Sequence, residues 1–342
     1  MNTRVRLATS LLPSLLPSLL PSLLPSLLSL VLPFALLTAC GEPDALDSAA
    51  LTDPATASQT ESLSADPTFA ARLYALPRTE YTIQQVGKAL DALLSARPRL
   101  DNIILFVHGR ACGGGGEPQK SLSSVVPELE SNYSAAVLLL YWPGSDSGCP
   151  LGFPESSARA AGPALRYLIA QIDRYRTDNP GKLATVRLSL LTHSMGNIVL
   201  QSALEGGATG VRGDLFSTVV LNSSATALSG HDAWLGRLDF GKNVYVTVNS
   251  GDNVLSASSI GRGPRLGRQL DAAPLTARAD YVDVSASRVN HQYYVRSGMK
   301  GKTLPAFYNR VLDGLPYDFA ASTAVTRTVR RSGATIYFFD GK

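Results

Sequence analysis

The chain has few cysteines and few charged residues for its length of 342 residues, and neither charge sign dominates. Its three cysteines are too few for a disulfide scaffold and lack the spacing of metal ligands. Arg4 and Arg6 are two of the 31 basic residues, so the chain without them carries 29 basic against 27 acidic residues. A nearly neutral body without a basic run argues against nucleic-acid binding, which requires clustered cations. We expect no metal, no cofactor and no nucleic-acid partner.

Charged residues make up 17% of the sequence and apolar ones 45%, a composition outside the range of disordered chains. Single α/β domains of 250 residues or more are common, so this length allows one large domain. The leader is different, because no acidic residue precedes Glu42 and the stretch from Leu11 to Ala39 carries no charge.

Two arginines before this uncharged stretch are typical of a secretory signal, which we predict over residues 1–39. The stretch is long enough for a membrane-spanning anchor to be an alternative. Its five prolines argue against an anchor, because each removes a helix hydrogen bond.

The stretch ends in Leu37-Thr38-Ala39-Cys40-Gly41, which resembles the lipobox of bacterial lipoproteins. The resemblance implies that Cys40 is lipidated, becomes the mature N-terminus and anchors the protein to a membrane of the bacterial cell envelope, facing the periplasm or the cell surface. Ordinary secretion is the second alternative. Residues 40–68 are rich in Ala, Ser, Thr, Asp and Pro, so we predict a disordered tether, followed by a domain over residues 69–342.

Short, nearly continuous apolar runs alternate with helical patterns along this domain, as in strands buried on both faces of a parallel sheet. The predicted strands are Ile103–Val107, Ala136–Tyr141, Val186–Leu191, Thr218–Leu221, Val244–Val248 and Tyr281–Val284. The predicted helices are Thr82–Ser95, Pro163–Thr177, Met195–Glu205, Asn253–Ser259 and Leu304–Asp313. This order predicts an α/β fold with a doubly wound, mostly parallel sheet. A C-terminal hairpin is expected over Ala324–Phe339.

Ser194 stands where a predicted strand ends and a helix begins, and such a turn projects a serine into the crevice above the sheet. The usual pattern is G-x-S-x-G; here Gly196 is present and Thr192 replaces the first glycine. A serine that only caps the helix is an equally good interpretation of the turn alone.

The domain also supplies a base and an acid in the order that this type of site requires, Ser-Asp-His. His291 follows the last parallel strand, and Asp252 follows the strand before it, so both are expected at the carboxyl edge of the sheet. His231 is the weaker base and is better explained as a surface or capping histidine. Three other acids are weaker candidates. Asp232 and Asp239 precede the predicted strand Val244–Val248, towards the wrong end, and Asp283 lies within the predicted strand Tyr281–Val284. Asp252 could also be an ordinary turn residue.

An oxyanion hole is predicted from the backbone N–H groups of Met195 and Arg110. Gly109 lets the chain turn close to the site, and His108 is expected to be structural. The Arg110 side chain could meet an acidic substrate group, although a solvated charge is the default.

Three segments resemble the α/β-hydrolase superfamily, and more narrowly a bacterial family of α/β hydrolases of unknown function. They are Phe106-Val107-His108-Gly109, Tyr141-Trp142-Pro143 and Thr192-His193-Ser194-Met195-Gly196-Asn197. The resemblance covers residues 101–294, and it implies an α/β-hydrolase type of sheet.

By the same resemblance Ser194, Asp252 and His291 are the triad of a serine hydrolase, because Asn249–Leu255 and Asn290-His291 fit the family's acid and histidine positions. We therefore expect a small-molecule ester or related acyl substrate, and the absence of a long apolar lid insertion favours small or soluble esters. Lipase, thioesterase and peptidase activities stay open. A non-catalytic, lipid-tethered binding module is the alternative.

Two further features concern loops at the same edge. Cys112 and Cys149 follow the first two predicted parallel strands, and an exported protein can oxidise them, so we predict a disulfide worth about 3–4 kcal/mol. The glycine run 113–116 lacks the Lys-Ser/Thr of a phosphate loop, so it is interpreted as a flexible mouth of the site.

Overall fold

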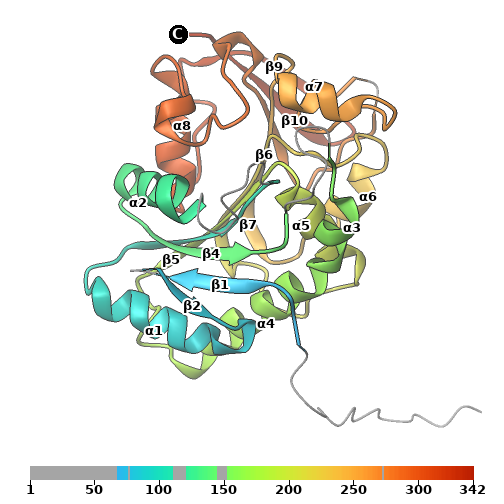
Figure 1. Ribbon diagram of the computed structural model, residues 1–342. Coiled ribbons are helices and arrows are strands. Elements are labelled where there is room, and N and C mark those ends of the chain that lie inside the picture. The colour runs from blue at the N-terminus through green and yellow to red at the C-terminus, as the bar shows by residue number, and fades with distance from the viewer. Residues whose placement is uncertain (1–67, 76–77, 111–120, 145–151, 272) are drawn as a thin grey trace, which may run out of the picture. The chain divides into compact units, whose positions relative to one another are not determined.

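The computed structural model describes residues 68–75, 78–110, 121–144, 152–271 and 273–342 (Figure 1). The predicted signal peptide and almost all of the predicted tether lie outside these ranges, as do Cys40, Cys112, Cys149 and the glycine run 113–116. In the part of the chain that is described, no helix is both long and apolar enough to cross a membrane.

Ten strands of the described chain form one sheet in the order β2-β1-β4-β3-β5-β6-β7-β8-β10-β9. Their bounds are β1 (Arg72–Ala75), β2 (Thr79–Tyr81), β3 (Asn102–Val107), β4 (Ala136–Tyr141), β5 (Arg187–His193), β6 (Phe216–Asn222), β7 (Gly241–Val248), β8 (Asp280–Asp283), β9 (Val325–Arg331) and β10 (Ala334–Phe339).

Eight α-helices and four shorter helical turns accompany these strands in the described residues. The α-helices are α1 (Val86–Ala96), α2 (Val126–Tyr133), α3 (Glu155–Ala160), α4 (Gly162–Asp178), α5 (Gly196–Glu205), α6 (His231–Leu235), α7 (Asn253–Ser259) and α8 (Thr303–Leu312). The turns are η1 (Ile83–Gln85), η2 (Ser121–Val125), η3 (Ser285–Ser287) and η4 (Arg296–Gly298).

The sheet is doubly wound and mostly parallel, as predicted. Neighbouring strands from β4 through β3, β5, β6 and β7 to β8 all pair in parallel, and β10 pairs in parallel with β8. The chain runs from β3 outward to β4 on one side and from β5 outward to β6 on the other. The connections after β3 and β5 therefore diverge, and such a switch point opens a crevice at the carboxyl ends of the strands.

Both faces of the sheet are covered, which explains the continuous apolar runs. In β3 the side chains of Ile103, Leu105 and Val107 join one core cluster, while Ile104 and Phe106 join the other. The first cluster contains side chains of α1 and α3 to α7, and the second contains side chains of α2 and α8. All six residues of β3 are buried.

Several elements lie outside the predicted pattern. The short strands β1 and β2 form an antiparallel edge next to β4. The two edge strands total seven residues, and β2 (Thr-Glu-Tyr) is mostly exposed, so neither carries an apolar run. The helix α3 buries only Ala158, so it also lacks an apolar stripe. The C-terminal hairpin is present as β9 and β10, and it turns at Ser332 and Gly333, which both have positive φ.

Candidate active site

Ser194 occupies the tight turn between β5 and α5, at the crevice between the connections of β3 and β5. Its φ is +52°, a left-handed conformation that non-glycine residues adopt at a cost of about 1–3 kcal/mol. Three backbone hydrogen bonds hold it there. The N–H of Ser194 donates to the carbonyl of Asn222 at 3.0 Å, and its carbonyl accepts from the N–H groups of Asn197 and Ala225, both at 3.2 Å. The serine is 7% exposed.

The turn can be this tight because Gly196 carries no side chain. A Cβ atom on Gly196 would lie 2.4 Å from the carbonyl oxygen of Val107 and 2.6 Å from that of His108, closer than real Cβ contacts. Gly109 meets the same constraint, because its Cβ would lie 2.8 Å from the Cβ of Ser194. The backbone of the loop after β3 and that of the first turn of α5 therefore lie in close contact next to Ser194.

Thr192 fits the position that glycine usually occupies, and its side chain ties the turn together. Its buried hydroxyl donates to Oδ1 of Asn197 at 2.7 Å. The Nδ2 of Asn197 in turn donates to the carbonyls of Ser194 at 3.0 Å and Asn222 at 3.1 Å. The departure from glycine at this position therefore leaves the elbow geometry intact.

The Ser194 side chain does not cap α5. The N-cap residue of this helix is Met195, and no side-chain hydrogen bond caps it in the described structure. The structure thus gives no support to the interpretation of Ser194 as a helix cap.

Asp252 and His291 are joined by a hydrogen bond. The Nδ1 atom of His291 lies 2.7 Å from Oδ2 of Asp252, whose side chain is fully buried. The other carboxylate oxygen accepts the N–H of Leu255 at 3.0 Å, so Asp252 is also the N-cap of α7. An ionised carboxylate only accepts, so Nδ1 carries a proton, and in the neutral imidazole Nε2 of His291 is then the acceptor. The two hydrogen bonds compensate for the burial of the charge.

Two loops bring this pair together at the carboxyl edge of the sheet. After β7, Asn249 forms a turn in which its Oδ1 accepts from the N–H of Gly251 at 3.0 Å. Its Nδ2 donates to the carbonyl of Val289 at 3.1 Å in the loop that carries the histidine. The Ser223 hydroxyl, beyond β6, donates to the carbonyl of His291 at 2.9 Å. These hydrogen bonds hold the backbone of the loop that carries His291 in place.

Ser194 and His291 line one pocket of about 160 Å³. The structure therefore brings together the three side chains predicted from the sequence: Ser194 and His291 share a pocket, and Asp252 hydrogen-bonds the histidine. The other predicted candidates are engaged elsewhere. The interpretation of His231 as a surface histidine is wrong: it is fully buried and contacts the carbonyl of Leu228 at 2.7 Å and the hydroxyl of Tyr281 at 3.0 Å. Nor is it the N-cap of α6, which is Gly230.

Two of the three competing carboxylates have local backbone or side-chain partners. Asp239 accepts from the hydroxyl of Thr209 at 2.7 Å, and Asp283 accepts from the N–H of Ser285 at 2.9 Å. Asp232 is the second residue of α6, on the chain segment before β7. None of the three is hydrogen-bonded to a histidine side chain in the described residues.

Met195 and Arg110, together with Ser194, line a second and larger cavity, of about 340 Å³. Their backbone N–H groups donate to no acceptor among the residues that the structure describes. The guanidinium of Arg110 donates to the carbonyl of Gly152, so it is not a purely solvated charge. His108 is structural, as predicted: its Nε2 accepts the N–H of Trp142 at 3.1 Å, and its carbonyl accepts the Trp142 indole at 2.9 Å.

His193 lies beside the pair as a buried neutral group. Its ring centroid is 4.7 Å from those of both His291 and Tyr294. Burial lowers the pKa of His193 well below its usual value, and the neighbouring His291 and His108 lower it further. Because His193 stays neutral, it adds no positive charge next to His291.

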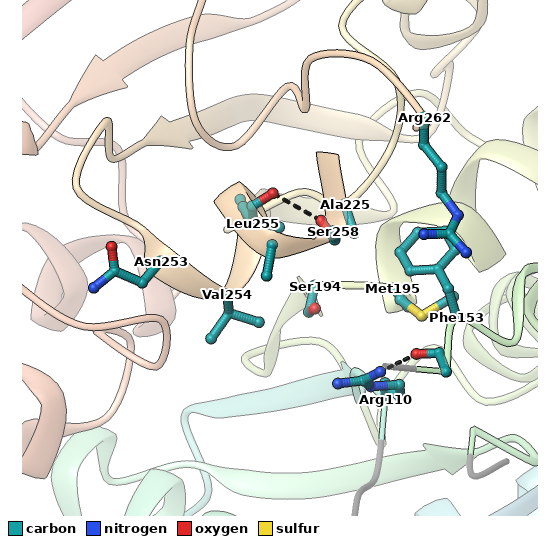
Figure 2. Close-up of a pocket in the computed structure, with 12 residues that line it drawn as sticks. Arg110, Phe153, Ser194, Met195, Ala225, Asn253, Val254, Leu255, Ser258 and Arg262 are labelled. Atoms are coloured by element: carbon teal, nitrogen blue, oxygen red, sulfur yellow. Dashed lines mark hydrogen bonds between the residues drawn. The ribbon is translucent and has the colours of Figure 1, made fainter. Parts of the chain in front are cut away.

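This second cavity, of about 340 Å³, also contains Ser194 (Figure 2). In Figure 2, Ser194 lies between Arg110 and the helix α7 with Val254 and Leu255. Phe153 and Arg262 complete the wall, and neither was predicted from the sequence. Both lie outside the strand ends that the prediction relied on, and no local motif marks them. No three His, Cys, Asp or Glu side chains gather as metal ligands in the described chain.

Comparison with known proteins yields structural similarity only. No protein-family model matches the chain, and no curated protein matches it. The chain is similar to the crystal structure of DphMB1, at 15% identity over 63% of this chain and 78% of that one, with a TM-score of 0.37.

Two esterases are similar to a comparable degree. Carboxyl esterase 2 of the mycorrhizal fungus Tuber melanosporum is 14% identical over 64% of this chain and 80% of that one, with a TM-score of 0.37. A hyperthermophilic esterase of the archaeon Pyrobaculum calidifontis is 16% identical over 63% and 77%, with a TM-score of 0.33. With these TM-scores below 0.5, the similarities assign neither a family nor an activity to this chain.

Proposed function

We propose that this chain is a serine hydrolase that cleaves carboxylic esters. The observation that carries the proposal is the 2.7 Å hydrogen bond between His291 and a fully buried Asp252, with the histidine in the same pocket as Ser194. A strained serine at a strand-to-helix turn, a neutral imidazole nitrogen and an orienting carboxylate are the parts that acyl transfer requires.

In the first half of the reaction, Oγ of Ser194 attacks the ester carbonyl carbon while its proton moves to Nε2 of His291. Asp252 keeps the imidazole in the right tautomer and stabilises its charged form. The carbonyl electrons move onto oxygen, and the N–H groups of Met195 and Arg110 hold the resulting oxyanion. When the intermediate collapses, the carbon–oxygen bond to the alcohol breaks, and His291 returns the proton to the leaving oxygen.

In the second half, water replaces the alcohol. His291 takes a proton from the water as its oxygen attacks the acyl-serine carbonyl carbon. Collapse of the second intermediate breaks the bond to Oγ, Ser194 recovers its proton, and the carboxylic acid leaves.

The test is labelling of the purified protein with a fluorophosphonate probe and hydrolysis of p-nitrophenyl butyrate. Ser194→Ala is expected to abolish labelling and lower kcat by about 10⁴-fold or more. Ser131→Ala, an exposed serine on α2, is the matched control and keeps both signals. Equal labelling of the wild type and Ser194→Ala would remove Ser194 from the mechanism. An unlabelled, inactive wild type would favour a non-catalytic binding module.

For location, we propose export and a lipid anchor on Cys40, from the lipobox resemblance. Metabolic labelling with an alkyne fatty acid is expected to mark the wild type and not Cys40→Ser. Label retained by Cys40→Ser would contradict the anchor.

The disulfide between Cys112 and Cys149 stays a prediction, and two free thiols in the unfolded, non-reduced protein would exclude it.

A further inference from the structure

Ser194 lines two cavities that differ in their other lining groups. Of these two, His291 lines only the smaller one, of about 160 Å³, together with His193 and Gln292. His291 also lines a third cavity, of about 580 Å³, whose described lining does not include Ser194. The larger cavity of about 340 Å³ contains Ser194 and Met195 but not His291. If Ser194 is the nucleophile, as proposed above, its base must reach the leaving oxygen to return a proton. The leaving alcohol therefore belongs in the smaller cavity and the acyl chain in the larger one.

The larger cavity has apolar walls suited to an acyl chain. Phe153, Met195 and Ala225 line it together with Val254 and Leu255 of α7. In Figure 2, Phe153 lies on the side opposite Val254 and Leu255. Its volume lies within the range of small-molecule sites, which is about 300–1,000 Å³. Val254 lines this cavity and is 46% exposed, so a molecule in the cavity can reach its side chain.

The charged side chains in the described lining of this cavity are arginines. Arg110 and Arg262 both line the cavity, and its described lining contains no carboxylate. Arg262 stacks on the ring of Phe153, with its guanidinium carbon 4.9 Å from the ring centroid (Figure 2). Arg265 stacks on the same ring at 4.8 Å. Two guanidinium groups thus line this apolar cavity, and a third stacks on Phe153, which lines it.

Two of these three arginines already have partners. Arg110 donates to the carbonyl of Gly152, and the buried Arg265 donates to the carbonyls of Ser258 at 2.9 Å and Ala225 at 3.2 Å. The exposed Arg262 forms no ion pair within the described residues. Glu155, an acid whose charge acts on Arg265, is bonded to Arg159 at 3.0 Å. Arg262 is therefore the cation available to a ligand.

We propose that the substrates are esters whose acyl chain carries a carboxylate beyond its apolar part, and that Arg262 binds this carboxylate. The apolar walls hold the methylene chain next to Ser194, and the guanidinium at the rim pairs with the charged end. The assignment of the acyl chain to the larger cavity and of the alcohol to the smaller one rests on the proposed function. An ester of a dicarboxylic acid with one free carboxylate is the simplest molecule of this class.

The first experiment compares p-nitrophenyl hexanoate with mono-p-nitrophenyl adipate, whose six-carbon acyl chain ends in a carboxylate. Using the full chain, we expect kcat/KM to be higher for the adipate ester. Arg262→Gln is expected to lower the adipate-to-hexanoate ratio about fivefold, as for a partly exposed ion pair. The control Arg237→Gln, an exposed arginine after α6, keeps the wild-type ratio. The preference should also shrink at 0.5 M salt through screening.

The second experiment measures binding without turnover, so that it separates this inference from the proposed function. Monoethyl adipate and ethyl hexanoate are titrated into the Ser194→Ala protein in a calorimeter. We expect tighter binding of monoethyl adipate and loss of that preference when Arg262→Gln is added. Equal binding of the two esters, or a preference that persists without Arg262, would overturn the inference even if ester hydrolysis is found. A preference that depends on Arg262 supports it even if the wild type hydrolyses neither ester.

Discussion

At the residue scale, the space that Gly196 leaves open decides the shape of the serine turn. Replacing Gly196 with Ala would place a Cβ atom against two carbonyl oxygens of the backbone after β3, and backbone cannot move aside as a flexible side chain can. We expect Gly196→Ala to lower the free energy of unfolding by about 1–3 kcal/mol. We also expect it to abolish ester hydrolysis, because the turn that carries Ser194 must shift.

The control for this variant is Gly181→Ala, at an exposed turn where an added Cβ would meet no atom within 4 Å. Urea unfolding should give a change within about 0.5 kcal/mol for the control. If Gly196→Ala unfolds at the same urea concentration as the control and keeps its activity, the close approach is not required for the fold or for the site.

At the element scale, α7 begins on the residue that orients the histidine. Asp252→Asn retains an oxygen that can cap α7, because asparagine is as good an N-cap as aspartate. It loses the charge that fixes His291, so kcat is expected to fall about 10⁴-fold with only a small change in melting temperature. Asp252→Ala loses the cap as well and should cost about 1 kcal/mol more in stability. The measurements are initial rates on p-nitrophenyl butyrate and thermal unfolding; wild-type rates in Asp252→Asn would contradict the orienting role.

At the scale of the whole molecule, two buried histidines make stability depend on pH. Burial is the main cause that lowers the pKa of both His193 and His231 below the usual 6.5. A base with a depressed folded pKa binds fewer protons in the native state, so its stabilisation is present above about pH 6.5 and is lost as the pH falls below it. We expect each histidine to lower the free energy of unfolding by up to about 1.4 kcal/mol for each pH unit of acidification.

The measurement is the free energy of unfolding in urea between pH 8 and 5.5, for the wild type and for His231→Gln. The variant loses two hydrogen bonds and is less stable at every pH, but its loss of stability on acidification should be smaller than that of the wild type. Parallel curves for the two proteins would show that His231 titrates normally.

The sequence predicts the central sheet well because its strands are buried on both faces. Ile103–Val107 and the five runs that follow correspond to β3 through β8, displaced by at most a few residues. The strands β1 and β2 escape prediction because they have only four and three residues, too few for an apolar run, and β2 is also mostly exposed. The helix α3 escapes for a related reason, since one buried alanine gives no helical periodicity.

Positions at strand ends can be predicted, because parallel strands deliver the residues that follow them to one edge. This argument places Ser194, Asp252 and His291 at the same edge, and the hydrogen bond between the last two is found there. The walls of the larger cavity cannot be predicted in this way. Phe153 precedes α3 and Arg262 follows α7, and their stacking depends on the path of two loops that no local pattern specifies.

The double role of α7 has a consequence for how this protein could change. The same seven-residue helix supplies Val254, Leu255 and Ser258 to the proposed acyl cavity, and it receives its cap from the carboxylate that is hydrogen-bonded to His291. A substitution that tilts this helix to admit a longer or bulkier acyl chain also disturbs the hydrogen bond between Asp252 and His291. Changes in substrate selectivity at α7 are therefore expected to change the rate of turnover as well. Variants that widen the range of accepted molecules at no loss of speed should arise on the opposite wall, at Phe153.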